Sequence, residues 1–233
     1  SGRIALISAQ KKNDALETMA ELLDKNREGI ISANHKDIAK AGSLRLTRAM
    51  IDRLTLTSSR IDFMIEGLRK VIALPDPIGT ILKDYSVPSG LRITKVRVPM
   101  GVIFIIYESR PNVTVDSAGL CFKSGNSVIL RGGKEAVHSN IFLTEILQSA
   151  MERHNLPRDC IQIIKTQSHS AIPVLLKLRK YIDLVIPRGG EKLIETVTNI
   201  SRIPVIKHYK GICHIYVDKD ADLDMASRIV INA

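Results

Sequence analysis

The feature that most constrains the fold is a series of short apolar runs that begins at Gly101. The runs are rich in β-branched residues and read "GVIFIIY", "SVIL", "CIQII", "DLVIP" and "IPVI". Segments of helical character separate them, at about 113–124, 135–154, 168–180 and 190–201. Unbroken apolar strands that alternate with helices are typical of a parallel sheet covered on both faces. We therefore predict an α/β fold in which each of these runs is a strand of one parallel sheet.

The chain before this sheet is predicted to be helical. Residues 3–40 carry apolar side chains at helical spacing, and 48–74 predicts two more helices, the second capped by Thr57 or Ser58. The apolar face of the first segment contains Ala15, Met19, Leu22 and Leu23. The prolines of "LPDPIG" cannot continue a helix, so they end this region.

The stretch "TILKDYSVPSGLRITKVRVPMG" alternates polar and apolar residues on either side of Pro88, Ser89 and Gly90. This pattern predicts a β-hairpin. Its second half, "LRITKVRV", would have one apolar and one basic face. Such a ribbon is either the edge of a sheet or an arm that pairs with another subunit, and the sequence leaves both interpretations open.

Composition narrows the class of protein. The 233 residues are 45% hydrophobic and 25% charged, as in globular proteins, and no apolar run has the roughly 18 residues that a membrane helix needs. Cys121, Cys160 and Cys213 are too unevenly spaced for a disulfide framework or a zinc site, so we expect a reduced, cytoplasmic protein without a metal. The N-terminus lacks the apolar stretch of a signal peptide.

The net charge of +10 indicates a preference for anionic ligands. The cations are scattered among acids, and 4 Phe, 5 Tyr and no Trp provide few stacking platforms, so we do not expect nucleic-acid binding. A positive surface also attracts small anionic substrates, which is the explanation we prefer.

The loop after the second run, "LRGGKEAVHSN", could hold a phosphate. Gly132 and Gly133 permit close approach of a ligand or positive φ, and Arg131 and Lys134 supply cations. The helix that follows is expected to offer free backbone N–H groups. Neither G-x-G-x-x-G nor G-x-x-x-x-G-K-[ST] occurs, so an ordinary strand–helix turn remains an alternative.

A second glycine pair follows the fourth run, in "IPRGGEKLIETV". Gly189 and Gly190 again stand at a strand–helix junction, and a helix is expected to begin near Glu191. Ligands of parallel sheets bind beyond the carboxyl ends of the strands. Two such junctions in one sheet favour a ligand-binding interpretation of both loops.

The loop after the first run, "ESRPN", contains Glu108, Ser109, Arg110 and Asn112. Arg110 could bind a carboxylate or phosphate with both of its terminal nitrogens. Asn112 has two interpretations: a donor to a developing oxyanion, or the cap of the next helix.

Several segments together resemble the glutamate-5-semialdehyde dehydrogenase (γ-glutamyl phosphate reductase) family, a branch of the aldehyde dehydrogenase superfamily. They are "VRVPMGVIFIIYESRPNVTVDSAGLCFKSGNSVILRGGKEAVHSN", "DRLTLTSSRIDFMIEGLRKVIALPDPIG" and "VIPRGGEKLIETV…IPVIKHYKGICHIYVDKDADLD". The resemblance covers nearly the whole chain and implies an aldehyde-dehydrogenase-like, Rossmann-type sheet. The implied reaction reduces L-glutamyl 5-phosphate with NADPH to glutamate 5-semialdehyde, phosphate and NADP⁺, in proline biosynthesis.

The resemblance also assigns roles to the glycine loops. In the superfamily the first loop reads approximately K-P-x-E and holds the adenosine ribose; Arg131 matches its lysine and Lys134 its glutamate. A lysine there attracts a 2′-phosphate that a glutamate would repel, which favours NADP(H) over NAD(H). The segment Gly189–Glu191 matches the loop near the cofactor pyrophosphate. Asn112 aligns with the oxyanion asparagine only through a gap.

Other positions depart from the superfamily. His208 falls where hydrolytic relatives carry a general base, and an acyl-phosphate reductase needs no such base. Whether His208 has a role of its own, such as phosphate binding, is open; we group it with Glu108, Ser109 and Arg110 as substrate-binding residues. The family's nucleophilic cysteine is expected beyond Ala233, and Cys213 does not match it. The chain as given is therefore expected to bind cofactor and to be inactive.

We divide the chain into an N-terminal helical part (1–79), a hairpin that is a candidate oligomerisation arm (80–98), an NADP-binding α/β core (99–220) and the start of a truncated catalytic domain (221–233). A homo-oligomer is expected, with glutamate kinase as a functional partner. The alternatives are another aldehyde dehydrogenase acting on free aldehydes and a non-catalytic nucleotide-binding module.

Overall fold

A four-stranded parallel sheet organises the described part of the chain in the computed structural model. The structure describes residues 1–168, 170–207 and 214–232. The strands lie in the order β5-β4-β3-β6 and all pairs are parallel. Their bounds are Val102–Tyr107 (β3), Ser127–Arg131 (β4), Ile161–Ile163 (β5) and Leu184–Arg188 (β6). The prediction of a parallel sheet is confirmed for four of the five apolar runs.

The fifth run, "IPVI", is not a strand in this structure. It contributes an isolated parallel bridge between Val205 and Val185. Pro204 has no N–H to donate to a ladder, which is why prolines are found at the edges of sheets. The helix expected over 168–180 is also shorter, because the described part of it is helical only in α8 (Ala171–Leu175) and continues as turns.

Helices cover both faces of the sheet, as predicted. Successive residues of a strand point to opposite faces, and β3 shows this pattern: Ile103 and Ile105 belong to one buried cluster, Phe104 and Ile106 to the other. The first cluster includes α2 (Ala9–Lys25), α5 (Ser58–Ala73), α6 (Asn112–Lys123) and α7 (Val137–Arg153). The second includes α8 and α9 (Glu191–Ile200).

The N-terminal helices follow the sequence prediction closely. Besides α2 and α5 they are α1 (Gly2–Ala5), α3 (Arg27–Ala39) and α4 (Arg48–Leu54). The predicted apolar face of α2 is fully buried. Thr57 caps α5, since its side chain accepts a hydrogen bond from the backbone N–H of Arg60. An apolar residue at the cap, such as valine, has no side-chain oxygen to accept from this N–H group.

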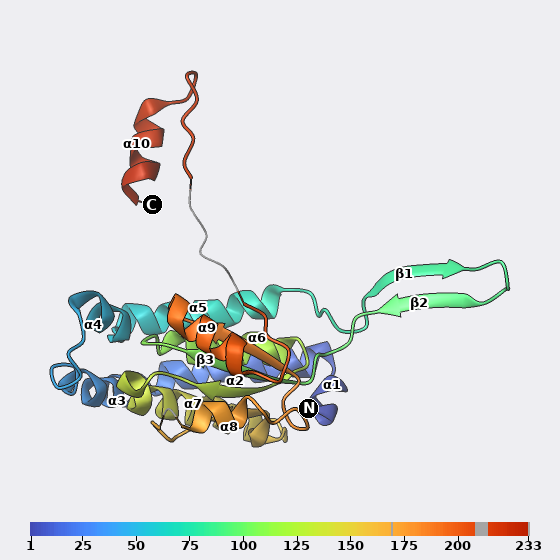
Figure 1. Cartoon of the computed structure of the whole chain (residues 1–233), viewed down its shortest axis with the longest axis horizontal. Coiled ribbons are helices and arrows are strands. Elements are labelled where there is room, and N and C mark those ends of the chain that lie inside the picture. The colour runs from blue at the N-terminus through green and yellow to red at the C-terminus, as the bar shows by residue number, and fades with distance from the viewer. Residues whose placement is uncertain (169, 208–213, 233) are drawn as a thin grey trace.

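The hairpin forms a separate sheet of β1 (Ile81–Ser86) and β2 (Arg92–Val96), which pair antiparallel. Gly90, with φ of 83°, lies in the turn where a left-handed backbone is needed. The hairpin projects from the body of the molecule (Figure 1) and does not extend the main sheet. The hairpin is therefore not an edge of the main sheet, and pairing with another subunit stays a prediction.

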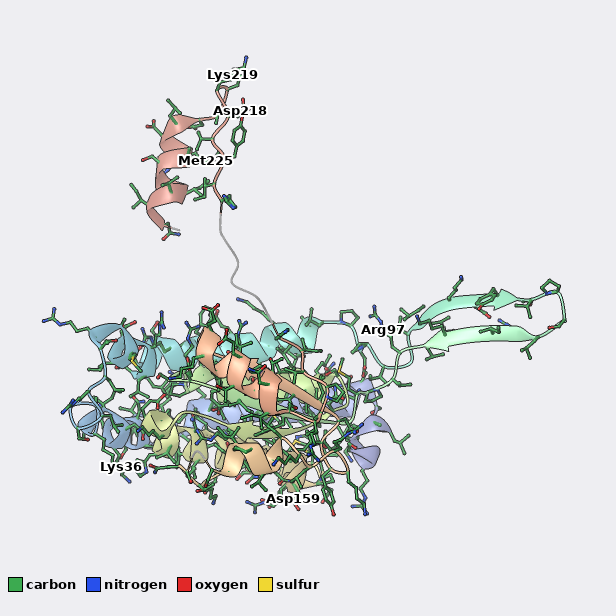
Figure 2. The ribbon with its side chains drawn as sticks, in the orientation of Figure 1. Lys36, Arg97, Asp159, Asp218, Lys219 and Met225 are labelled. Atoms are coloured by element: carbon green, nitrogen blue, oxygen red, sulfur yellow. The ribbon has the colours of Figure 1, made fainter. Side chains whose placement is uncertain are left out.

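The C-terminal helix α10 (Leu223–Asn232) lies apart from the helices around the sheet, and none of its residues is buried. Figure 2 shows Met225 in this helix, and Asp218 and Lys219 just before it, away from the packed side chains of the core. Across the described ranges, no helix combines the length and the apolar character that crossing a bilayer would require.

Candidate nucleotide-binding edge of the sheet

Three of the predicted loops meet at one edge of the sheet. The loops follow β4, β3 and β6, and these strands are parallel neighbours in that order. The carboxyl ends of parallel strands lie at the same edge, so "ESRPN" lies between "RGGKE" and "PRGGEK". The structure thus brings together the loops that the sequence analysis selected.

A small pocket lies at the end of β4, lined by residues of the "RGGKE" loop and by Thr166 and Gln167, which follow β5. Arg131 is 4% exposed. Its terminal nitrogens donate to the backbone oxygens of Gly132, at 2.6 Å, and Gln167, at 3.3 Å, while its Nε has no partner. Burial lowers the pKa of the Arg131 guanidinium, and the nearby Glu135 carboxylate opposes this effect. A buried cation with a free donor favours an anion in this pocket.

Lys134 stands at the rim of the same pocket and is exposed. It begins a short 3₁₀ turn, Lys134–Ala136, that leads into α7. With Arg131 it gives the pocket two cations. Sequence reasoning missed Thr166 and Gln167, which line it as well. Their position just after the run "CIQII" was the available signal, because ligand loops follow strand ends.

The expectation of free N–H groups at the start of α7 is wrong. Asp37, from α3, accepts hydrogen bonds from the backbone N–H groups of His138, at 3.1 Å, and Ser139, at 2.8 Å. The Ser139 hydroxyl also donates to Asp37, at 2.7 Å. A protein carboxylate therefore already occupies the place where a helix N-terminus would bind an anion. A phosphate at this loop would therefore not find these two N–H groups free, which favours binding by the side chains of Arg131 and Lys134.

The four glycines are not required by backbone conformation. None of Gly132, Gly133, Gly189 and Gly190 has a positive φ, and Gly133 and Gly190 are extended. A methyl group at the first three would overlap the end of a neighbouring side chain, which would then have to move, whereas Gly190 has room beside it. At Gly132 the neighbour is Asn140, which belongs to a buried network with Thr114 and Tyr107.

The β3 loop is tied to both glycine loops by carboxylates. Ser109 is buried, and its N–H and hydroxyl donate to Glu135 Oε1 at 2.9 and 2.6 Å. Glu108 is exposed and accepts a hydrogen bond from the Gly190 N–H at 3.0 Å. Gly190 is the cap residue of α9, which begins at Glu191.

Asn112 and Arg110 differ in how they are held. Asn112 is the first residue of α6 and donates from Nδ2 to Asp116 Oδ2 at 3.1 Å. The residue at the cap position is Pro111, so the interpretation of Asn112 as the helix cap is wrong. Burial raises the pKa of Asp116, while the hydrogen bond from Asn112 lowers it. Arg110 is exposed and faces solvent.

The remaining candidates lie elsewhere. His208 and Cys213 fall outside the described residues. Cys121 and Cys160 are buried, and burial raises the pKa of each thiol to about 12. Thiols of this kind are inert. In the described part of the chain, no group of three or more His, Cys, Asp or Glu side chains is placed to bind a metal ion.

The structure is an α/β fold with three loops at one edge of its parallel sheet. Comparison with known proteins is more specific. The model of the aldehyde dehydrogenase family matches residues 2–233. The chain therefore belongs to the aldehyde dehydrogenase family.

Relatives within the family share a name. A protein of Thermodesulfovibrio yellowstonii named gamma-glutamyl phosphate reductase is 52% identical over 230 residues, which are 99% of this chain and 55% of that protein. One from Aquifex aeolicus with the same name is 50% identical, over 95% of this chain and 51% of the relative.

Solved structures of proteins with the same name are also similar to this chain. The crystal structure of gamma-glutamyl phosphate reductase from Thermotoga maritima has a TM-score of 0.90 and 40% identity, covering 99% of this chain and 56% of that one. The Saccharomyces cerevisiae structure of the same name has a TM-score of 0.81 and 34% identity, over 98% of this chain and 58% of that one. The chain thus spans about half the length of the relatives it matches.

Proposed function

We propose that this chain forms the NADPH-binding part of an enzyme that reduces L-glutamyl 5-phosphate to L-glutamate 5-semialdehyde, with release of phosphate. The name shared by its relatives supports this reaction. The cofactor, when bound, supplies the hydride. The residues of this chain are proposed to bind and orient it at the strand ends.

The observation that carries the proposal is the pair of cations at the β4 pocket. Arg131 is buried with a free Nε, and no carboxylate lies within ion-pair distance of it among the described residues. Lys134 stands beside it on the rim. NADPH differs from NADH by a 2′-phosphate, and two cations at the adenosine end favour the phosphorylated form. We assign the 2′-phosphate to Lys134 and the ribose to Arg131.

The other two loops complete the proposed site. The Gly190 cap and the first turn of α9, from Glu191, lie at the proposed pyrophosphate position, supported by the match of "PRGGEK" to the superfamily loop. Arg110 is proposed to bind an anionic group of the substrate, and Glu108 and Ser109 are proposed to contact other parts of the substrate beside it. Asn112 is kept as a proposed oxyanion donor; its amide would have to leave Asp116 to act in this way.

Calorimetric titration with NADPH and NADH tests the cofactor proposal. We expect NADPH to bind at least about tenfold more tightly, which is ~1.4 kcal/mol of difference. Lys134→Glu should remove most of this preference by weakening NADPH rather than NADH. Lys36→Glu, a charge reversal at an exposed position of α3 that Figure 2 labels, is the matched control and should leave the ratio unchanged. Equal affinities of the wild-type chain for both nucleotides would contradict the proposal.

We also propose that the hairpin arm makes the protein a homo-oligomer. A two-stranded hairpin is marginally stable alone, and this one exposes a set of large apolar side chains. They include Ile81, Leu82, Tyr85, Leu91 and Val96. The proposed setting is the cytoplasm, with glutamate kinase supplying the acyl phosphate. Light scattering tests the arm: Tyr85→Lys together with Val96→Lys should lower the molar mass in solution, and an unchanged mass would exclude the arm as the interface.

A further inference from the structure

The two glycine pairs contain a shared arrangement that the proposed cofactor site does not explain. Gly133 lies against the carboxylate of Glu135, and Gly189 lies against the carboxylate of Glu108. In each case an added methyl group would overlap the glutamate; at Gly189 it would lie 2.6 Å from Glu108 Cδ. Each glutamate is hydrogen-bonded to a backbone N–H of a different loop.

We infer that Glu135 and Glu108 are positioning residues, each seated on a glycine, that fasten the β3 loop to the two loops beside it. Glu135, in the β4 loop, accepts hydrogen bonds from Ser109 in the β3 loop. Glu108, in the β3 loop, accepts a hydrogen bond from Gly190 in the β6 loop. Gly133 and Gly189 leave room for these carboxylates where they lie, and a methyl group at either position would make the glutamate move out of its hydrogen bond.

The Glu135 contact is the stronger of the two. Its Oε1 accepts two hydrogen bonds from Ser109, and Ser109 is 5% exposed. Hydrogen bonds to an ionised acceptor are shorter and stronger than neutral ones. The same carboxylate lies near enough to Arg131 to raise its pKa against the effect of burial. Glu135 therefore fixes both the spacing of two loops and the electrostatic surroundings of the pocket cation.

Gly190 differs from the other glycines. A methyl group there would meet the Glu108 carboxylate only at 3.9 to 4.0 Å, an ordinary contact. Its backbone is extended, with φ of −66° and ψ of 162°, which any residue can adopt. Among the four glycines, only Gly190 has room for a methyl group next to the described residues.

A double-mutant cycle on Gly133 and Glu135 tests the inference. Gly133→Ala alone should weaken NADPH binding about tenfold, because the methyl group displaces Glu135. In a Glu135→Ala background the same Gly133→Ala change should have no further effect on affinity. The backbone at Gly133, with φ of −62° and ψ of 153°, accepts alanine without strain, so the coupling reports on the carboxylate. Equal losses in both backgrounds would mean that the cofactor itself needs the glycine, and would overturn the inference.

Two further variants separate positioning from general stability. Glu135→Gln keeps an oxygen that can accept from Ser109 and should bind NADPH within about twofold of the wild type, whereas Glu135→Ala should not. The control pair, Gly42→Ala and Glu66→Ala, makes the same two changes at exposed positions away from the sheet edge and should show no coupling. All affinities are measured well below the unfolding temperature of each variant. A Gln variant as weak as the Ala variant would contradict the positioning role.

The inference rests on the proposed NADPH site for its binding measurements, and the melting temperature provides an independent measurement. If the wild-type chain binds no NADPH, the proposed function fails, but the contacts between the glutamates and the glycines can still be tested. Gly133→Ala should then lower the melting temperature in the wild-type background and leave it unchanged or raise it in the Glu135→Ala background. The cycle of Gly189→Ala with Glu108→Ala should show the same sign. Additive shifts of the melting temperature in both cycles would refute the contacts between these glutamates and glycines.

Discussion

Replacing Asp37 tests the account of how α7 begins. The carboxylate is 1% exposed and accepts three hydrogen bonds, from the N–H groups of His138 and Ser139 and from the Ser139 hydroxyl. Asp37→Ala leaves these donors buried without an acceptor. Loss of a cap costs about 1 kcal/mol and a second unsatisfied buried donor about 1–3 kcal/mol, so we expect a loss of about 3 kcal/mol in the free energy of unfolding.

Urea unfolding, followed by circular dichroism, measures this loss. With a slope of roughly 2–3 kcal/mol per molar urea for a chain of this size, the midpoint should fall by about 1 M. Asp37→Asn should lose less, because one oxygen remains as an acceptor. Asp159→Ala is the control: Asp159 is exposed, is labelled in Figure 2, and should change the midpoint by little.

The same variant separates two accounts of phosphate binding. If the N-terminus of α7 were the phosphate site, removing the Asp37 charge would free two N–H groups and strengthen NADPH binding. Our account places the phosphate on side chains, so binding should become no tighter. A stability loss below about 1 kcal/mol, or tighter NADPH binding, would refute the reasoning.

Three further outcomes are expected. Burial raises the pKa of Asp76, but hydrogen bonds from the Lys12 ammonium and a backbone N–H outweigh it and hold the pKa below its usual value. The stabilisation is present above the unfolded pKa and is lost as pH falls through the folded pKa, so the unfolding midpoints of wild type and Asp76→Asn should converge below about pH 4. Cys121 and Cys160 should react with a thiol reagent at pH 8 only after denaturation, and reaction in the native protein would contradict their burial. Limited proteolysis should cut the exposed arm, 81–96, before the sheet, and an arm as resistant as β3 would show that it is covered.

The main sheet was predictable because its signal is local. The run "GVIFIIY" is apolar at every position, and β3 buries residues of both alternating sets in different cores. Local signals also placed Thr57 as a cap and the "LPDPIG" stop. "IPVI" has a similar composition but forms only a bridge, because its proline limits backbone pairing. Composition alone also does not show whether a neighbouring strand is free to pair with it.

The shared location of the candidate loops was predictable, but their contacts were not. Strand ends and glycine pairs selected three loops that the structure places at one edge of the sheet. The partner of each group, however, comes from distant sequence: Asp37 caps a helix 101 residues further along the chain, and Glu108 meets Gly190 at a separation of 82 residues. A glycine that makes room for a carboxylate and a glycine that makes room for a ligand look the same in sequence.

The most direct test of the central claim is a crystal structure of the protein with NADPH. We predict the 2′-phosphate beside Lys134 and Arg131 at the end of β4, with Asp37 still capping α7 and Glu135 still bound to Ser109. A 2′-phosphate seated on the N-terminus of α7 in place of Asp37, or an adenosine end bound away from the β4 loop, would contradict the account.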